Sequence, residues 1–154
     1  MTPLSKMITA HEGVETHAYK CTADKITIGV GRNIDPKGGI GLSPREIHFL
    51  LANDIERVEE ELSMELPWTI DLIMHSPARY DALVDICFNL GMPRLKKFEK
   101  ALQASYQHNW EVAADEFMDS RWAKQVGARA VEICAMIRTG EYQKDYYRKV
   151  KYEG

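Results

Sequence analysis

The stretch that decides the fold lies at residues 11–31 and reads HEGVETHAYKCTADKITIGVG. It contains two short strand-like runs, at residues 16–20 and 26–30, rich in β-branched and aromatic side chains. Between them lies Thr22-Ala23-Asp24-Lys25, a polar segment that is typical of a turn. The stretch therefore predicts a β-hairpin, set in a chain whose other segments favour helices.

Alternate residues of the second run share a face of the predicted strand. The apolar face, which we expect to pack inward, consists of Ile26, Ile28 and Val30. The opposite face carries Thr27, Gly29 and Gly31. Because glycine has no side chain, a ligand can approach the backbone closely on this second face.

A helix is predicted immediately before the hairpin. Thr2-Pro3 suits an N-cap followed by proline at the first helical position, and Gly13 suits the end of the helix. The apolar stripe between them is formed by Leu4, Met7, Ile8 and His11. Glu12 then falls on the last turn, where the helix dipole and partial burial favour a protonated carboxyl, as a general acid requires. On position alone, a solvent-exposed glutamate is the alternative.

The rest of the chain has a helical period. Ser43-Pro44-Arg45-Glu46 has the pattern of a capping box and predicts a long helix to about Glu65. The run Tyr80–Leu90 is apolar on most faces and predicts a buried central helix. Further helices are expected at Phe98–His108, Trp110–Met118 and Val126–Arg138.

These elements predict a mostly helical α+β protein forming a single domain. We expect a small β-containing lobe at about residues 13–60. The expected helical lobe comprises about residues 66–140 together with the N-terminal helix, and the long helix joins the two lobes.

Composition excludes several classes of protein. The 154 residues are 45% hydrophobic and 28% charged, which is ordinary for a globular protein. The net charge of −3 argues against nucleic acid as a partner. No stretch reaches the ~20 apolar residues of a membrane span, and no signal peptide is apparent. Three widely spaced cysteines argue against a disulfide framework and favour synthesis in a reducing cytoplasm.

Two other kinds of site were weighed against a Glu12-centred one. His11-Glu12 begins like a zinc-binding H-E-x-x-H motif, but Val14-Glu15 stands where the second histidine is needed, so we expect no metal. A Cys–His hydrolase would use Cys21 as the nucleophile, yet nothing in the sequence selects its histidine. Cys87 and Cys134 lie in apolar helical runs and are expected to be small buried residues.

The spacing of Glu12, Cys21 and Thr27 carries a family resemblance. Glu, eight residues, Asp or Cys, five residues and Thr is the active-site spacing of T4-type phage lysozymes, the endolysins of glycoside hydrolase family 24, and this chain resembles them. Later segments resemble the same family in the same order, and the resemblance spans roughly residues 4–140. Those segments are Cys87-Phe88-Asn89-Leu90-Gly91, Ser120-Arg121-Trp122, Arg129-Ala130 and Arg138-Thr139-Gly140.

The resemblance implies a two-lobed lysozyme-like fold and hydrolysis of the β-1,4 bond between N-acetylmuramic acid and N-acetylglucosamine in peptidoglycan. Glu12 would protonate the leaving oxygen, and Thr27 would help to position the attacking water. Phe88 looks like an aromatic residue of the family's sugar cleft, although a core phenylalanine is an equally good interpretation. With Gly31 on the ligand-accessible strand face, it forms the expected substrate-binding set, and no cofactor is implied.

Cys21 is the departure that needs explanation. Relatives with aspartate there have a group that titrates near ~3.9, whereas a free thiol near ~8.5 is only about 3% ionised at pH 7. We hypothesise that Cys21 acts as a thiolate, with Lys20 and Lys25 as the charges nearest in sequence. The alternative is a neutral thiol that only fills the position.

The resemblance also sets expectations for partners and location. The partner would be the peptidoglycan glycan strand, and the protein is expected to be a monomer. The enzyme would accumulate in the host cytoplasm and be released to the periplasm or cell wall during lysis, through a separately encoded holin. Two alternatives remain: a lytic transglycosylase acting on the same bond, and a wall-binding module on a decayed lysozyme scaffold.

Overall fold

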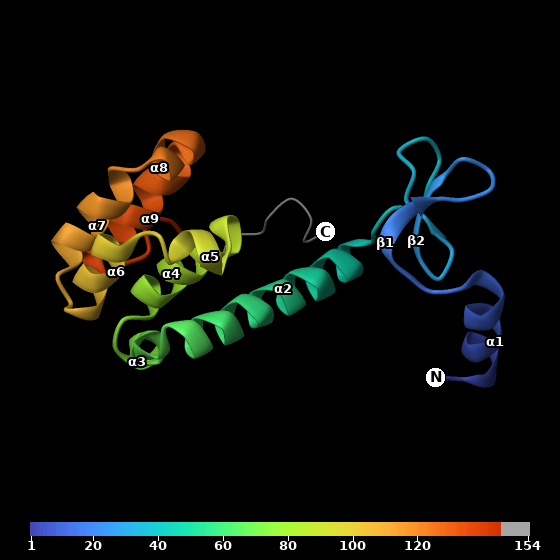
Figure 1. Ribbon diagram of the computed structural model, residues 1–154, viewed down its shortest axis with the longest axis horizontal. Coiled ribbons are helices and arrows are strands. Elements are labelled where there is room, and N and C mark those ends of the chain that lie inside the picture. Colours follow the sequence, from blue (N-terminus) through green and yellow to red (C-terminus); the bar gives the residue numbers. More distant parts are fainter. Residues whose placement is uncertain (146–154) are drawn as a thin grey trace. The chain divides into compact units, whose positions relative to one another are not determined.

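The computed structural model describes residues 1–145 and shows a mostly helical α+β fold with one small sheet, as the sequence predicts (Figure 1). The described part of the chain divides into two compact units: the N-terminal unit, Met1–His48, and the helical unit, which begins at Phe49. The N-terminal unit holds α1 (Pro3–Glu12), β1 (Glu15–Lys20), β2 (Ile26–Gly29), β3 (Arg32–Asn33) and the start of α2 (Pro44–Glu65). The predicted lobe assignment, in which the first helix belongs with the helical lobe, stays a prediction.

Helix α1 begins and ends where the sequence predicts. The Thr2 hydroxyl accepts a hydrogen bond from the backbone N–H of Ser5 at 3.1 Å, which satisfies one donor of the first turn. Gly13 has φ +78° and donates its N–H to the Thr9 carbonyl at 2.9 Å. This left-handed conformation favours glycine and ends the helix directly after Glu12.

The three strands form an antiparallel sheet in the order β1-β2-β3. Tyr19 of β1 faces Thr27 of β2, and Ile28 of β2 faces Arg32 of β3. The β1–β2 loop is the predicted turn, in which Asp24 adopts φ +58° and donates its N–H to the Cys21 carbonyl at 2.9 Å. Strand β3 is an addition to the predicted hairpin, because its two residues are too few to give a sequence pattern.

Burial in the sheet differs from the expectation for the second strand. Thr27 is the buried residue of the N-terminal unit at 4% exposure, whereas Ile28 is half-buried and Val30 is exposed. The physical reason is that the Thr27 hydroxyl donates to the Lys25 carbonyl at 3.0 Å, so that a polar side chain is satisfied beneath the hairpin loop. The prediction that the apolar face packs inward is therefore wrong within this unit.

The capping box predicted for α2 is present. The backbone N–H of Ser43 donates to the Glu46 carboxylate at 2.8 Å, and the Glu46 N–H donates to the Ser43 hydroxyl at 3.2 Å. The same carboxylate accepts from Arg32 Nη1 at 2.9 Å. Because Arg32 lies on β3, its guanidinium ties the sheet to the first turn of α2.

The helical unit is built around α9, which contacts α4, α7 and α8. Its fully buried side chains include Leu83, Ile86, Phe117 and Ile137, and α2 contributes Val58 and Leu62 to the same core. The expected central helix is α4, which is buried along most of its length, although it begins three residues earlier than predicted. The elements that follow α2 are η1 (Pro67–Thr69), α3 (Ile70–His75), α4 (Pro77–Leu90), α5 (Met92–Leu95), α6 (Glu99–Tyr106), α7 (Trp110–Met118), α8 (Arg121–Val126) and α9 (Ala128–Thr139).

Arg79 on α4 holds the C-terminal end of α9. Its Nε donates to the Ile137 carbonyl at 2.7 Å and its Nη2 to the Arg138 carbonyl at 3.0 Å. The guanidinium also lies 4.6 Å from the centroid of the Trp110 ring. A cation thus satisfies carbonyl groups that the end of a helix leaves without partners.

Replacing Arg79 with methionine is expected to lower the free energy of unfolding by about 2–3 kcal/mol, because two carbonyls lose a charged donor. Urea-induced unfolding followed by circular dichroism measures the change. Arg57→Met is the matched control, since the Arg57 side chain is 65% exposed and pairs with Asp54 on the surface, where an ion pair contributes at most ~1 kcal/mol. A loss no larger than that of the control contradicts this account of Arg79.

Within residues 1–145, none of the helices is both long and apolar enough to cross a bilayer.

Candidate active site

Glu12 lies at the C-terminal end of α1, against the backbone of Gly31. A methyl group built on Gly31 would lie 2.7 Å from Glu12 Oε2 and 3.0 Å from its carboxyl carbon. Gly31 is the second residue of the Val30-Gly31 turn between β2 and β3, so this turn presents bare backbone to the carboxyl group. The two residues that the sequence predicted as acid and as ligand-accessible glycine are therefore neighbours.

Cys21 occupies the first position of the loop that joins β1 to β2, and its thiol faces backbone N–H groups. Hydrogen bonds from the backbone of Lys25 and then of Ala23 lower the pKa of Cys21 from its ordinary value, and the nearby Thr27 hydroxyl acts in the same direction. Backbone dipoles that converge on a sulfur stabilise the thiolate over the thiol. The sequence suggested Lys20 and Lys25 as the cause, whereas the structure gives that role to peptide groups.

The other two cysteines have the opposite environment. Cys87 on α4 and Cys134 on α9 are 1% and 4% exposed. Burial raises the pKa of each to about 11, so both are un-ionised near neutral pH. The prediction that they are small buried residues is confirmed, and of the three cysteines Cys21 is the one whose pKa is lowered.

Thr27 joins Cys21 to the sheet. Its hydroxyl donates to the Lys25 carbonyl at 3.0 Å, and it also stabilises the Cys21 thiolate, which lowers the pKa of that thiol. Because the hydroxyl has one hydrogen, it donates to one of these two acceptors at a time, while its lone pairs can accept from a water molecule. The loop and strand thereby hold both side chains together in the N-terminal unit.

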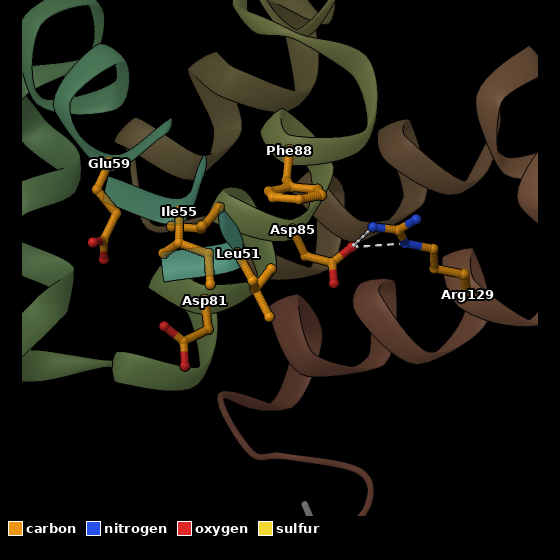
Figure 2. Close-up of a pocket in the computed structure, with 8 residues that line it drawn as sticks. Leu51, Ile55, Glu59, Asp81, Asp85, Phe88 and Arg129 are labelled. Carbon is orange, nitrogen blue, oxygen red and sulfur yellow. Dashed lines mark hydrogen bonds and ion pairs between the residues drawn. The ribbon is translucent and has the colours of Figure 1, made fainter. Parts of the chain in front are cut away.

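Phe88 lies in the helical unit, on the last turns of α4, and its side chain is 42% exposed. It lines a pocket of about 390 Å³ with Leu51 and Ile55 of α2, and Figure 2 shows its ring beside the Asp85 carboxylate. The Phe88 ring is accessible to solvent, so Phe88 is not an enclosed core residue. Its role in substrate binding stays a prediction.

An ion pair in the same pocket was not singled out by the sequence. Arg129 of α9 donates from Nε and Nη2 to Asp85 Oδ1 of α4, both at 2.8 Å (Figure 2). Nearby, the Trp122 indole N–H donates to the Asn89 amide oxygen at 2.8 Å. One indication of these residues was present in the sequence, because the segments that carry the family resemblance include Asn89, Trp122 and Arg129. Their pairings span 33 and 44 residues, which no local pattern reveals.

The two alternative sites find little support. Helix α1 ends at Glu12 and residues 15–20 form a strand, so the segment that begins with His11-Glu12 is not the single helix that an H-E-x-x-H site requires. Among residues 1–145, no three His, Cys, Asp or Glu side chains gather where they would hold a metal ion. Cys21 takes its lowered pKa from backbone groups and Thr27, not from a histidine base.

Comparison with known proteins assigns the chain to a family. The phage lysozyme family matches residues 9–138, which include every residue of the candidate site. The chain belongs to the phage lysozyme family. The resemblance to T4-type phage lysozymes is therefore confirmed.

Individual relatives agree with this assignment. A probable T4-type lysozyme 2 from Dictyostelium discoideum is 27% identical over 91% of this chain and 96% of its own length. An endolysin from Acyrthosiphon pisum secondary endosymbiont phage 1 is 24% identical, covering 90% of each chain. The pre-baseplate central spike protein Gp5 of Enterobacteria phage T4 is 24% identical over 91% of this chain but only 28% of its own length. The protein is accordingly a glycoside hydrolase of the lysozyme and endolysin type.

Gly31→Ala tests the contact with Glu12. The added methyl group would lie 2.7 Å from the carboxylate oxygen, so the acid must move, and we expect about a tenfold or greater loss of lytic activity. Gly29→Ala is the matched control, because Gly29 has the same φ of +68° but nothing within 4 Å of an added methyl group. Both variants should lose similar stability, about 1–2 kcal/mol, from the left-handed backbone. Equal lytic activity of the two variants on purified cell walls contradicts the proposed contact.

Proposed function

We propose that the enzyme is an N-acetylmuramidase that hydrolyses the β-1,4 bond between N-acetylmuramic acid and N-acetylglucosamine in peptidoglycan and so lyses the host cell. The observation that carries the proposal is the arrangement in the N-terminal unit: a glutamate packed on a bare glycine, and a low-pKa thiol beside a threonine. Glycoside hydrolysis by direct displacement requires a general acid on one side of the sugar ring. On the opposite side it requires a group that positions and activates the attacking water.

Glu12 is the proton donor in this proposal. Its protonated carboxyl transfers a proton to the glycosidic oxygen as the bond to the anomeric carbon breaks, so the leaving sugar departs as a neutral alcohol. Gly31 leaves room for the carboxyl group, because no side chain occupies the space against which Glu12 lies.

Cys21 and Thr27 act on water. As a thiolate, Cys21 would stabilise the positive charge that develops on the sugar ring and accept the proton that the attacking water loses as its oxygen bonds to the anomeric carbon. Thr27, whose single hydrogen is given to the Lys25 carbonyl, offers lone pairs to the same water. A negative sulfur in place of a carboxylate preserves the pairing of one protonated acid with one anion that glycosidases use.

A lytic transglycosylase is the second candidate function. Such an enzyme cleaves the same bond with an internal hydroxyl of the muramic acid and returns an anhydro-sugar. The hydrogen-bonding capacity of Cys21 and Thr27 for water favours hydrolysis. Mass spectrometry of digested peptidoglycan distinguishes them, since hydrolysis adds one water to each product and transglycosylation adds none.

The biological setting is part of the same proposal. The enzyme would act on peptidoglycan glycan strands as a monomer, accumulate in the host cytoplasm, and reach the periplasm through a holin-type pore. The relative named as an endolysin supports this role. Expression in a Gram-negative host should leave culture density unchanged until the membrane is permeabilised, and then clear the culture. A culture that clears without permeabilisation argues against the holin requirement.

A further inference from the structure

A second aromatic site lies on the helical unit and includes no residue of the candidate active site. Trp68 of η1 and Tyr106 at the end of α6 form an edge-to-face pair, with ring centroids 6.1 Å apart and planes at 76°. The two rings line a surface groove of about 410 Å³, together with the apolar Leu66 and Leu102 and the polar Lys96, Glu99 and Gln103. The Trp68 ring is half-buried against the core, whereas Tyr106 is 58% exposed. The groove therefore has a fixed wall and an accessible ring at right angles to it.

Three polar side chains at this groove have hydrogen-bonding groups without a partner among the described residues. Within residues 1–145, the Trp68 indole N–H, the Tyr106 hydroxyl and the Gln103 amide form no hydrogen bond with another group. The Trp122 indole, by contrast, donates to Asn89 at 2.8 Å. Because Trp68 is half-buried and its unpaired indole N–H reaches solvent, this donor is available to a ligand.

The lining favours a sugar over an apolar partner. A pyranose ring has a C–H face that packs on an aromatic ring and a rim of hydroxyl and acetamide groups that hydrogen-bond to indole, amide and hydroxyl groups. The Lys96 ammonium is already paired with the Glu65 carboxylate at 2.7 Å, and Glu99 lies beside it. Charged groups at the rim disfavour a lipid tail or an apolar helix, because these would have to desolvate them.

We propose that the Trp68–Tyr106 groove is a second binding site for the N-acetylated glycan strand of peptidoglycan. The inference rests on the proposed function for its choice of glycan. Because the substrate is a polymer, contact at a second site raises the effective concentration of the strand near the enzyme without any change at the reacting bond.

Nuclear magnetic resonance of the indole N–H groups tests binding directly. The probe is a soluble β-1,4-linked N-acetylglucosamine oligomer, added to the Glu12→Gln variant so that no cleavage occurs. We expect the indole N–H resonance of Trp68 to shift in a saturable way, while the Trp110 resonance does not shift. The Trp68 resonance is assigned by its absence from the spectrum of Trp68→Phe. Tyr106→Ala should weaken the affinity about fivefold or more through loss of the exposed ring. A Trp68 resonance that does not move at millimolar oligomer overturns the proposal.

Binding to cell walls stripped of stem peptides separates this inference from the proposed function. In the Glu12→Gln background, Tyr106→Ala should reduce bound protein about fivefold, whereas the exposed Met74→Ala control should not. Unchanged binding by Tyr106→Ala overturns the second site and leaves the muramidase proposal intact. If the wild-type enzyme cleaves no wall while the Trp68 resonance still titrates with oligomer, the muramidase proposal fails and the groove stands. If Tyr106→Ala reduces binding to walls that keep their stem peptides but not to stripped walls, the ligand is a peptide and the glycan assignment is overturned.

Discussion

Glu12→Gln is expected to reduce cell-wall lysis by about 10²–10⁴-fold, the contribution of a positioned general acid. The amide is nearly the same size as the carboxyl group but has no proton to give to the glycosidic oxygen. A turbidity assay on permeabilised Gram-negative cells measures the loss, with residual activity near the detection limit.

The same variant should fold as well as the wild type. Glu12 is exposed at the end of α1, and its close neighbour is the backbone of Gly31, which an amide also tolerates. We therefore expect the free energy of unfolding to change by less than about 0.5 kcal/mol. A folded Glu12→Gln protein that still clears cell walls would place the acid elsewhere.

Cys21 gives the second large effect. Cys21→Ser is expected to lose about 10²-fold or more of the lytic activity, because a serine hydroxyl does not ionise near neutral pH. Cys21→Asp should keep most of the activity, since a carboxylate supplies the same negative charge. Initial rates on purified peptidoglycan compare the three proteins, and equal rates for serine and cysteine across the neutral range contradict a thiolate role.

The pH profile follows from the direction of the pKa shift. Backbone hydrogen bonds lower the pKa of Cys21, so the thiolate persists below the ordinary titration range of a thiol near ~8.5. Activity that depends on the thiolate should fall as the pH falls through that lowered pKa. Cys21→Asp should stay active to lower pH, because aspartate titrates near ~3.9.

Alkylation provides an independent check of the same claim. Cys87 and Cys134 are buried, and their pKa is raised to about 11, so iodoacetamide should react first at Cys21. The wild type should lose activity in proportion to the label incorporated, whereas Cys21→Asp should keep its activity under the same treatment.

Local signals in the sequence were sufficient for most elements of the fold. Thr2, Ser43 and Asn109 each cap a helix through their side-chain oxygen, and such residues have preferences that act over three positions. The α9 helix ends at Gly140, in the left-handed conformation that glycine favours. Elements of a few residues, such as β3 and α5, were not predicted because they are too short for a period to appear.

Contacts between residues far apart in the chain could not be predicted from local sequence patterns. The hold of Arg79 on the end of α9 joins positions 58 and 59 residues apart, and nothing near Arg79 in the sequence indicates it. The burial of Thr27 also reversed the expected strand face, and the hydrogen bond from its hydroxyl to the Lys25 carbonyl satisfies this buried polar group.

The candidate site shows the same division. Glu12, Cys21 and Thr27 were identified by spacing, and their family was confirmed by comparison. That backbone groups rather than Lys20 lower the pKa of Cys21 depends on the conformation of residues 21–25, which a residue pattern does not specify. Phe88 and Arg129 converge on one pocket only through the packing of α4 against α9.

The central claim is hydrolysis of the glycan with Glu12 as the acid, and digestion of purified peptidoglycan in water labelled with heavy oxygen tests it most directly. With the wild-type enzyme, we expect mass spectrometry to show one heavy oxygen on each new N-acetylmuramic acid reducing end. With Glu12→Gln, we expect no such ends. Unlabelled anhydro-sugar ends, or labelled ends from the Glu12→Gln variant, would contradict it.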